Sequence, residues 1–154
     1  MKTHNSKKAQ ALTVGDAQKD GTIFAGISPD KEHNMFVTPQ DTPNKLAWEA
    51  AMTHISTFNA HGHADWVLPT QDELDILYKN RNKGDLKGTF NKNASDTIDS
   101  WYWSCKLHPR LAQHTWVKQF NNGYRELGLN TFRAHVRPVR LEPRPQQERN
   151  PGIF

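Results

Sequence analysis

Apolar residues recur at steps of three and four positions along the stretch from residue 44 to about residue 59. The members of this pattern are Leu46, Ala47, Ala50, Ala51, Ile55 and Phe58. Such a pattern predicts an amphipathic helix with one face turned toward the core. We expect His61-Gly62-His63 to end this helix, because glycine readily adopts the left-handed turn that helix ends favour.

A second helix has a clear start signal at Thr70. Thr70 is the predicted N-cap and Glu73 stands at the third helical position, so the two residues form a capping box. Such a cap stabilises a helix by about 1 kcal/mol. We expect the helix to fade between residues 82 and 84. Its predicted buried stripe consists of Leu74, Leu77 and Tyr78.

Short apolar or aromatic runs bounded by turn residues predict strands on both sides of the helices. Near the N-terminus, a strand within residues 20–30 and a partner over residues 35–38 predict a small hairpin. Asn122-Gly123 is typical of a type I′ hairpin turn. Pro138 places the last strand at a sheet edge or ends it there, because proline cannot donate to a ladder. After a polar loop over residues 84–100, we expect strands over residues 101–105, 114–120, 124–129 and 134–140, the last of which closes the sheet.

The chain has 154 residues, the size of one domain, and only 35% of them are hydrophobic, so its core must rely on Trp, Phe and Tyr. A single cysteine, Cys105, excludes an internal disulfide. No run approaches the roughly 18 apolar residues of a membrane span, and residues 1–10 lack the apolar run of a secretory signal peptide. We therefore expect a cytoplasmic or particle-associated protein with a flexible segment over residues 1–19, a domain over 20–140 and a Pro/Arg/Gln-rich tail over 141–154.

Charge is divided unevenly along the chain. Residues 11–100 carry 8 Lys and Arg against 13 Asp and Glu, whereas residues 101–140 carry 7 against 1. Such asymmetry can steer an acidic partner onto one face of a protein. It is equally compatible with two halves that pack together and neutralise each other. In the second case Arg137 and Arg140 would pair with the acidic half, and we favour this structural role for Arg137.

Four aromatic blocks follow one another in fixed order, and an N-A-H-G-H-A-D-W run precedes and overlaps the first of them. The blocks are Trp66 to Leu74 (W-V-L-P-T-Q-D-E-L), Trp101-Tyr102-Trp103-Ser104, Trp116 to Gly123 (W-V-K-Q-F-N-N-G) and His135 to Arg140 (H-V-R-P-V-R). In order and spacing, over roughly residues 20–140, they resemble the Lcl C-terminal domain family of bacterial and phage proteins. That family belongs to the wider group of C-type-lectin-like folds, which includes formylglycine-generating enzymes.

The resemblance implies an α+β, C-type-lectin-like domain in which two helices pack on a twisted antiparallel sheet with long loops. It also implies that the C-terminal strands and loops form the variable, ligand-facing surface. The chain departs from relatives of this fold in its chemistry. It lacks the cysteine pair that holds copper in formylglycine-generating enzymes, and it lacks the E-P-N, Q-P-D and W-N-D motifs of calcium-dependent lectins. The resemblance therefore implies a fold and a style of binding, and no activity.

His61, His63 and Asp65 could ligate a metal, because alternate residues of an extended segment share one side. The favoured alternative is that they shape the turn before Trp66, since spacing alone does not establish a coordination set. We predict no metal site and no cofactor.

Cys105 could act as a nucleophile with His108 or His114 as its base. A reactive thiol needs a lowered pKa and access to solvent, and the sequence indicates neither. A buried, inert cysteine is the favoured alternative, and no Ser-nucleophile motif or phosphate-binding loop is present. We predict no catalytic residue.

The aromatic side chains divide into core and surface candidates. We expect Trp66, Trp103, Trp116 and Phe120 in the core. The predicted ligand-binding residues, on a surface built from residues 84–135, are Tyr102, Lys118, Asn121, Asn122, Tyr124, Arg125, Asn130 and Arg133. For Lys118, Arg125 and Arg133 the choice between binding an anion and pairing with an acidic residue is open.

Together these patterns predict a non-catalytic domain that binds a protein or a glycan, with a polyanion as a further candidate ligand. The asparagines of the second half would suit a surface diversified by a retroelement, although Asn in turns has its own conformational reason. Two alternatives come from other classes. One is a structural or assembly subunit of a phage or secreted particle, a homo-oligomer that docks through the tail at residues 141–154. The other is an enzyme like the formylglycine-generating proteins. We expect neither specific nucleic-acid binding nor a membrane span.

Overall fold

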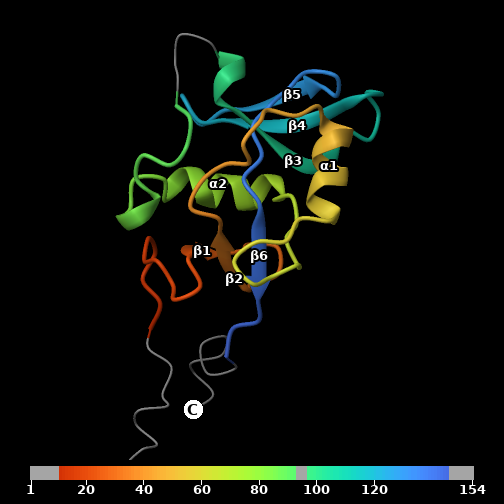
Figure 1. Cartoon of the computed structure of the whole chain (residues 1–154). Helices are drawn as coiled ribbons and strands as arrows, with labels where there is room; N and C mark the ends of the chain where they lie inside the picture. Colours follow the sequence, from red (N-terminus) through yellow and green to blue (C-terminus); the bar gives the residue numbers. More distant parts are fainter. Residues whose placement is uncertain (1–10, 93–96, 146–154) are drawn as a thin grey trace, which may run out of the picture.

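The computed structural model describes residues 11–92 and 97–145, which form two helices and two three-stranded antiparallel sheets (Figure 1). The chain is therefore of the α+β class, as predicted, although its strands form two sheets where one was expected. The helices are α1 (Trp48–Ser56) and α2 (Gln71–Lys79), and short 3₁₀ helices cover Gly84–Leu86 and Thr97–Ser100. The strands are β1 (Ile23–Ile27), β2 (Asn34–Val37), β3 (Trp101–Leu107), β4 (His114–Gln119), β5 (Arg125–Leu129) and β6 (Val139–Glu142).

The first sheet has the strand order β1-β2-β6 and so joins the two ends of the described chain. The predicted hairpin of β1 and β2 is confirmed, with Phe24 opposite Phe36. The chain before it is also held, because the Gly15 N–H donates to Phe24 and the Phe24 N–H donates to Asp16. Of the segment predicted to be flexible over residues 1–19, residues 15–18 are thus hydrogen-bonded beside β1, and residues 1–10 lie outside the described residues.

The second sheet has the order β3-β4-β5, and α2 lies between the two sheets (Figure 1). α2 contacts β1 on one side and β3 and β4 on the other. Its Leu74 and Leu77 are buried in a core that also holds Tyr102 and Phe120. α1 contacts β3, and its buried residues lie in a second core with Trp66, Trp101 and Trp103. Burial of these large side chains stabilises a domain whose apolar fraction is low.

The segment over residues 134–140 does not close the second sheet, which corrects the prediction. Its end, β6, pairs with β2 of the first sheet. Before that, Ala134 makes an isolated bridge with Leu46, and His135 makes one with Tyr102. Pro138 directly precedes β6, and β6 is the edge strand of the first sheet. This agrees with the prediction from the missing N–H of the proline. This segment therefore crosses from one sheet to the other.

Both helices lie where they were predicted, but α1 is shorter at both ends and α2 ends at Lys79 rather than near residues 82–84. α2 carries the predicted capping box, in which Glu73 N–H donates to Thr70 Oγ1 (3.1 Å) and Thr70 N–H donates to Glu73 Oε1 (2.9 Å). α1 is shorter than its apolar pattern, because Leu46 is bonded in extended form to Ala134. It also ends before the predicted glycine. Gly62, with φ +77°, serves a separate turn over residues 60–63.

The hairpin of β4 and β5 is confirmed, but its turn type is not. A type I′ turn needs positive φ at both central residues, and Asn122 does not have it. The loop is longer than two residues, as the Gly123 N–H donates to Gln119, and the Gln119 N–H donates to Tyr124 (both 2.8 Å). Gly123 alone is left-handed, at φ +83°.

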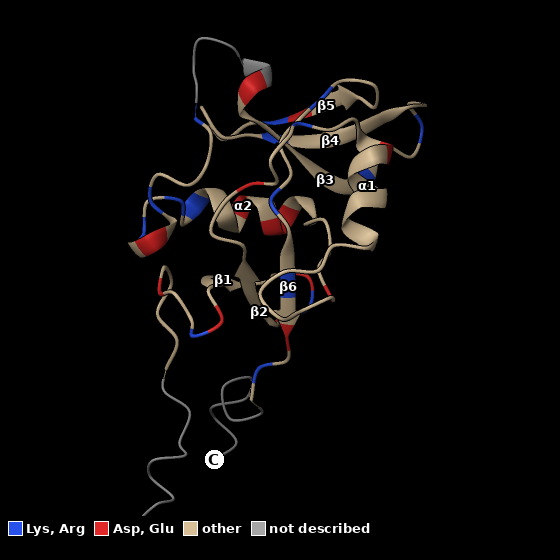
Figure 2. Cartoon of the chain, in the orientation of Figure 1, with Lys and Arg blue, Asp and Glu red and all other residues tan. Residues whose placement is uncertain are grey.

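The acidic and basic halves of the chain pack against each other, so the neutralising interpretation of the charge pattern is confirmed. Lys, Arg, Asp and Glu are interspersed over the elements in Figure 2. The ion pairs that join the halves are Lys118–Asp75, Arg125–Asp72, Arg125–Asp75, Arg137–Asp41 and Arg140–Asp65. Among the described residues no helix is long and apolar enough to cross a bilayer.

Arg137 has the structural role predicted for it. Its side chain is fully buried and donates from Nε to Asp41 Oδ1 at 2.9 Å. Its guanidinium also donates to Thr89 and lies 4.1 Å from the centre of the Phe90 ring. The Tyr102 hydroxyl donates to the other oxygen of Asp41 at 2.6 Å. One carboxylate thus joins three distant parts of the chain.

Replacing Arg137 by methionine keeps most of the stem but leaves Asp41 without its cation. We expect the free energy of unfolding to fall by about 3–5 kcal/mol, as when one partner of a buried ion pair is removed. Urea denaturation followed by tryptophan fluorescence measures the change. The control Arg133→Met alters an exposed arginine and should stay within about 0.5 kcal/mol of wild type. Equal losses in the two variants would contradict the role of Arg137.

Gly123 is held by its close approach to α2. A Cβ atom there would lie 2.6 Å from Cε2 of Tyr78, whereas one at Gly62, which has a similar φ, would meet nothing within 4 Å. Both alanine variants bear the cost of a left-handed backbone, and only Gly123→Ala adds overpacking of about 1–3 kcal/mol. Thermal unfolding should therefore separate the two variants. The same melting temperature for both would show that the hairpin moves away from Tyr78 freely.

Candidate functional site

Two of the eight predicted ligand-binding residues are buried, so their placement on the surface was wrong. Tyr102 is fully buried, and its hydroxyl is bonded to Asp41 and to the Asn91 N–H. Burial and the charge of Asp41 raise the pKa of this tyrosine. Lys118 is 7% exposed and donates to Asp75 (2.7 Å) and to the Gly123 carbonyl (2.6 Å). Both side chains hold the interior together.

The other six predicted residues lie toward the two ends of β5. At one end, Asn121 accepts from Ser100, and Asn122 holds the hairpin turn through Gln119 and Tyr124. Tyr124 is the most exposed of the large hydrophobic residues, at 65%. Arg125 follows it, and at the far end of the strand Asn130 accepts from Thr115 while Arg133 is exposed. The structure therefore does not gather the eight into one site.

The aromatic core predictions are confirmed for three of four residues. Trp66, Trp103 and Phe120 are buried, with exposures of 3% or less. Trp116 is only partly buried and contacts the ring of His108, with ring centroids 5.9 Å apart.

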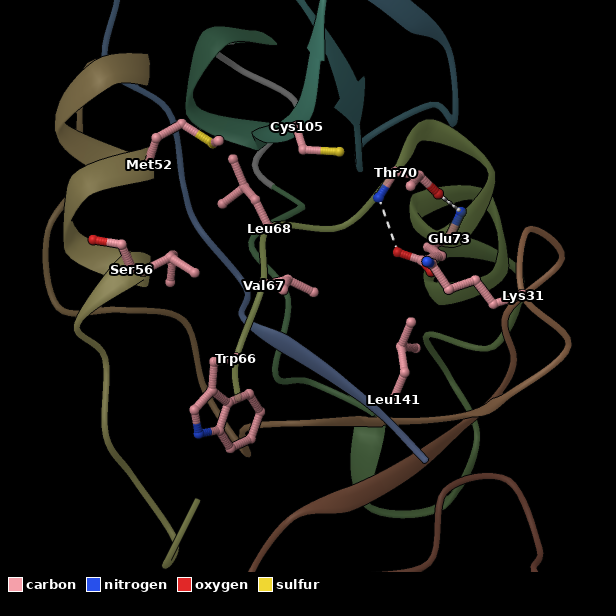
Figure 3. Close-up of a pocket in the computed structure, with 11 residues that line it drawn as sticks. Lys31, Met52, Ser56, Trp66, Val67, Leu68, Thr70, Glu73, Cys105 and Leu141 are labelled. Atoms are coloured by element: carbon pink, nitrogen blue, oxygen red, sulfur yellow. Dashed lines mark hydrogen bonds between the residues drawn. The ribbon is translucent and has the colours of Figure 1, made fainter. Parts of the chain in front are cut away.

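An apolar cleft that the sequence did not reveal opens between α1, the segment before α2, the end of β3 and the edge of β6 (Figure 3). Its cavity measures about 380 Å³. Its walls include Met52, Val67, Leu68, Cys105 and Leu141. Met52 and Val67 are exposed, at 38% and 44%, so apolar surface remains open to solvent here. Clefts of this size with apolar walls are typical of ligand sites.

The start of α2 forms the rim of the cleft and is held by a short network. Glu73 is buried, with 2% exposure, and its carboxylate accepts from Thr70 N–H and from Ser28 Oγ at 2.6 Å. The Thr70 hydroxyl donates in turn to Asp30. The capping box thus ties the helix start to the turn after β1. This rigid rim fixes the position of one wall.

A polar cavity of about 320 Å³ adjoins the cleft and shares Thr70 and Cys105 with it. Arg125 lines this second cavity and donates to Asp72 (2.7 Å) and Asp75 (2.5 Å). Burial would raise the pKa of Asp75, but its hydrogen bonds to Arg125 and Lys118 lower it overall. Of the eight predicted residues, Arg125 is therefore the one that lines the cavity next to the cleft, and it is already paired with acidic side chains.

Cys105 stands between the two cavities without the surroundings of a nucleophile. Burial raises the pKa of its thiol, and the nearby charge of Glu73 raises it further. His108 accepts from the Arg110 and Leu111 N–H groups, and His114 contacts the Ala112 carbonyl. The described residues that line the two cavities include no histidine.

His61, His63 and Asp65 turn to different partners. His61 and His63 contact Asp20, at 3.0 Å from its carbonyl and 2.8 Å from its carboxylate, whereas Asp65 accepts from Arg140 at 2.9 Å. The described residues contain no cluster of three ligands suited to a metal. The two histidines shape a turn that docks on the start of β1.

The fold and the site thus define an α+β domain with two small sheets and an open apolar cleft. The sequence profile of the Lcl C-terminal domain family matches residues 9–140. The chain belongs to this family. No curated protein sequence matches it.

The apolar walls of the cleft were missed because they come from four distant segments. One local signal was available at Val67, which stands between Trp66 and Leu68. Because alternate residues of an extended segment face opposite sides, burial of Trp66 and Leu68 directs Val67 outward. An outward β-branched residue in an aromatic block indicates an exposed apolar surface.

The turn contact at Asp20 predicts a pH dependence. Burial alone would raise the pKa of Asp20, but hydrogen bonds from the Thr22 backbone and His63 lower it from 3.8 to about 2. The stability that this carboxylate contributes is therefore present above pH 4 and is lost as pH falls toward 2. Asp20→Asn should lower the free energy of unfolding at pH 7 by at most about 1 kcal/mol, because the pair is partly exposed. Urea titrations from pH 7 to pH 2 should show the difference from wild type vanishing. A difference that persists at pH 2, or equals that of the exposed control Asp85→Asn, would contradict this assignment.

Proposed function

We propose that this chain is a non-catalytic binding domain with a C-type-lectin-like fold, and that its ligand occupies the cleft beside Cys105. The observation that carries the proposal is the open cavity of about 380 Å³ with apolar walls. It stands out because most large aromatic residues that the structure describes are buried. Two helices on antiparallel sheets with long connecting loops support the proposed fold.

The proposed binding surface overlaps the expected range of residues 84–135 and extends beyond it. Cys105, Lys106 and Arg125 come from that range, whereas Met52 and Val67 come from earlier segments. Apolar walls favour a protein ligand over a glycan, because sugar hydroxyls buried against them would lose hydrogen bonds to water without gaining partners. Proteins anchor instead through large apolar side chains that fill such pockets.

The state of Cys105 supports binding over catalysis. A nucleophilic thiol needs a lowered pKa and a base within reach. Here the thiol pKa is raised, and His108 and His114 are bonded within their own loop. The formylglycine-generating alternative therefore has less support than the binding domain.

Paired arrays of glycans and of peptides, probed at physiological salt, test the proposal. We expect saturable binding to members of the peptide array, weakened at least about tenfold in Val67→Arg because a charge would fill the apolar cleft. The matched control Leu111→Arg changes a residue that is also 44% exposed but lies outside the cleft, and it should bind like wild type. Cys105→Ser should also keep most of the binding.

Three outcomes would count against it. Equal losses in Val67→Arg and Leu111→Arg would remove the cleft from the binding surface. Binding to glycans alone would overturn the protein ligand. Binding seen only at low salt would indicate nonspecific attraction of polyanions to the basic residues.

A further inference from the structure

Within the described part of the chain, the outer edge of β6 has a hydrogen-bonding position without a backbone partner at Leu141. Val139 uses both backbone groups on its outer side, where the Val67 N–H donates to its carbonyl (2.8 Å) and its own N–H donates to Val67 (3.0 Å). An antiparallel strand directs the backbone groups of alternate residues to opposite sides. Leu141, two residues on, therefore directs its N–H and C=O to this same outer edge. Val67 makes only an isolated bridge, and no backbone partner of Leu141 is found on that side among the described residues.

This unpaired position lies at the cleft. Leu141 is one of the residues that line the cavity, together with Val67 from the paired end of the edge. Figure 3 shows Leu141 and Lys31 on one side of the cavity and Met52 and Ser56 of α1 on the other. An edge donor and acceptor thus stand next to an apolar hollow. Unpaired backbone groups at a sheet edge are the feature to which an extended peptide adds as a further strand.

The charges around the cleft favour an acidic occupant. Its carboxylates already have donors, since Asp30 accepts from Thr70, Asp72 pairs with Arg125, and Glu73 is bonded on both oxygens. Two cations remain. Lys31 lines the apolar cleft and Lys106 the adjoining cavity, and neither ammonium group has a hydrogen bond or ion pair with a described residue.

We propose that the cleft binds an extended segment of a partner protein that pairs with β6 at Leu141 and places one large apolar side chain in the cavity. Acidic residues beside this anchor would reach Lys31 and Lys106. The inference rests on the proposed function and specifies its ligand. Backbone pairing supplies the register, the cavity selects the anchor, and the two lysines select its charged neighbours.

The test uses a panel of capped seven-residue peptides with a central Phe, Leu, Trp or Met, flanked by valines and then by aspartates. Cys105 is the only cysteine in the chain and lines the cavity, so its rate of reaction with a thiol reagent reports occupancy. Hydrogen exchange at the Leu141 amide reports the strand pairing. We expect the best peptide to slow both rates with one shared saturation curve, at physiological salt.

Two matched peptides separate the parts of the inference without altering the protein. N-methylation of the backbone amide that faces Leu141 removes one ladder hydrogen bond and obstructs the edge, so it should weaken binding by about tenfold or more. Exchanging the aspartates for lysines should weaken binding by about threefold to tenfold, and Lys31→Ala should abolish most of this preference.

The outcomes separate this inference from the proposed function. Equal binding of the N-methylated peptide, or an unchanged Leu141 exchange rate, would overturn strand pairing while leaving the cleft as a binding site. Equal binding of the lysine peptide would overturn the acidic partner. If raising the protein concentration alone slows the reaction of Cys105, and sedimentation shows a dimer, then the occupant of the cleft is a second copy of the chain and not a partner protein. If no peptide in the panel protects Cys105 while the array ligand of the wild-type domain does, the extended-segment ligand is wrong and the cleft remains the site.

Discussion

A largely buried carboxylate shared by an arginine and a tyrosine holds the centre of this fold. Asp41 comes from the loop after β2, Tyr102 from β3 and Arg137 from the segment that crosses between the sheets. A buried charge is costly unless it is paired and hydrogen-bonded. The three groups therefore require one another, and they draw three segments together. Arg137 lies over Phe90, whose ring stacks on Phe120 with centroids 4.7 Å apart, so the polar centre and the aromatic core form one unit.

This centre determines the path of the C-terminal segment, and that path creates the cleft. Since Arg137 is fixed beside Asp41, the chain crosses from the second sheet to the first and ends as β6 against β2. β6 meets Val67 at one residue pair, and no further backbone pair on that edge is found among the described residues. The capping network at Thr70 and Glu73 holds the facing rim. The cavity lies between these two fixed walls, with Cys105 at the end of β3 beside it.

The proposed binding mode uses apolar side chains, backbone groups and charges that the packing of the domain does not itself use. The domain buries most of the large aromatic side chains that the structure describes, and Arg125, Arg137 and Arg140 pair with aspartates of the first half of the sequence. Around one cleft lie exposed apolar side chains at Met52 and Val67, together with the Leu141 backbone and the ammonium groups of Lys31 and Lys106, for which no partner is found on this side within residues 11–92 and 97–145. Apolar contact, backbone pairing and charge are the three means by which proteins recognise extended segments.

The sequence alone determined the features that depend on neighbouring residues. The capping box at Thr70, the hairpin of β1 and β2 and the position of the hairpin turn at Gly123, though not its type, follow from local chemistry, because caps and turns are decided within a few positions. Tertiary structure decided what depends on distant partners. Tyr102 and Lys118 carry groups suited to a surface, and only Asp41 and Asp75, more than 40 positions away, allow them to be buried. The pairing of β6 with the first sheet and the walls of the cleft also depend on contacts between residues that are distant in the sequence. No spacing pattern within the chain indicates such contacts.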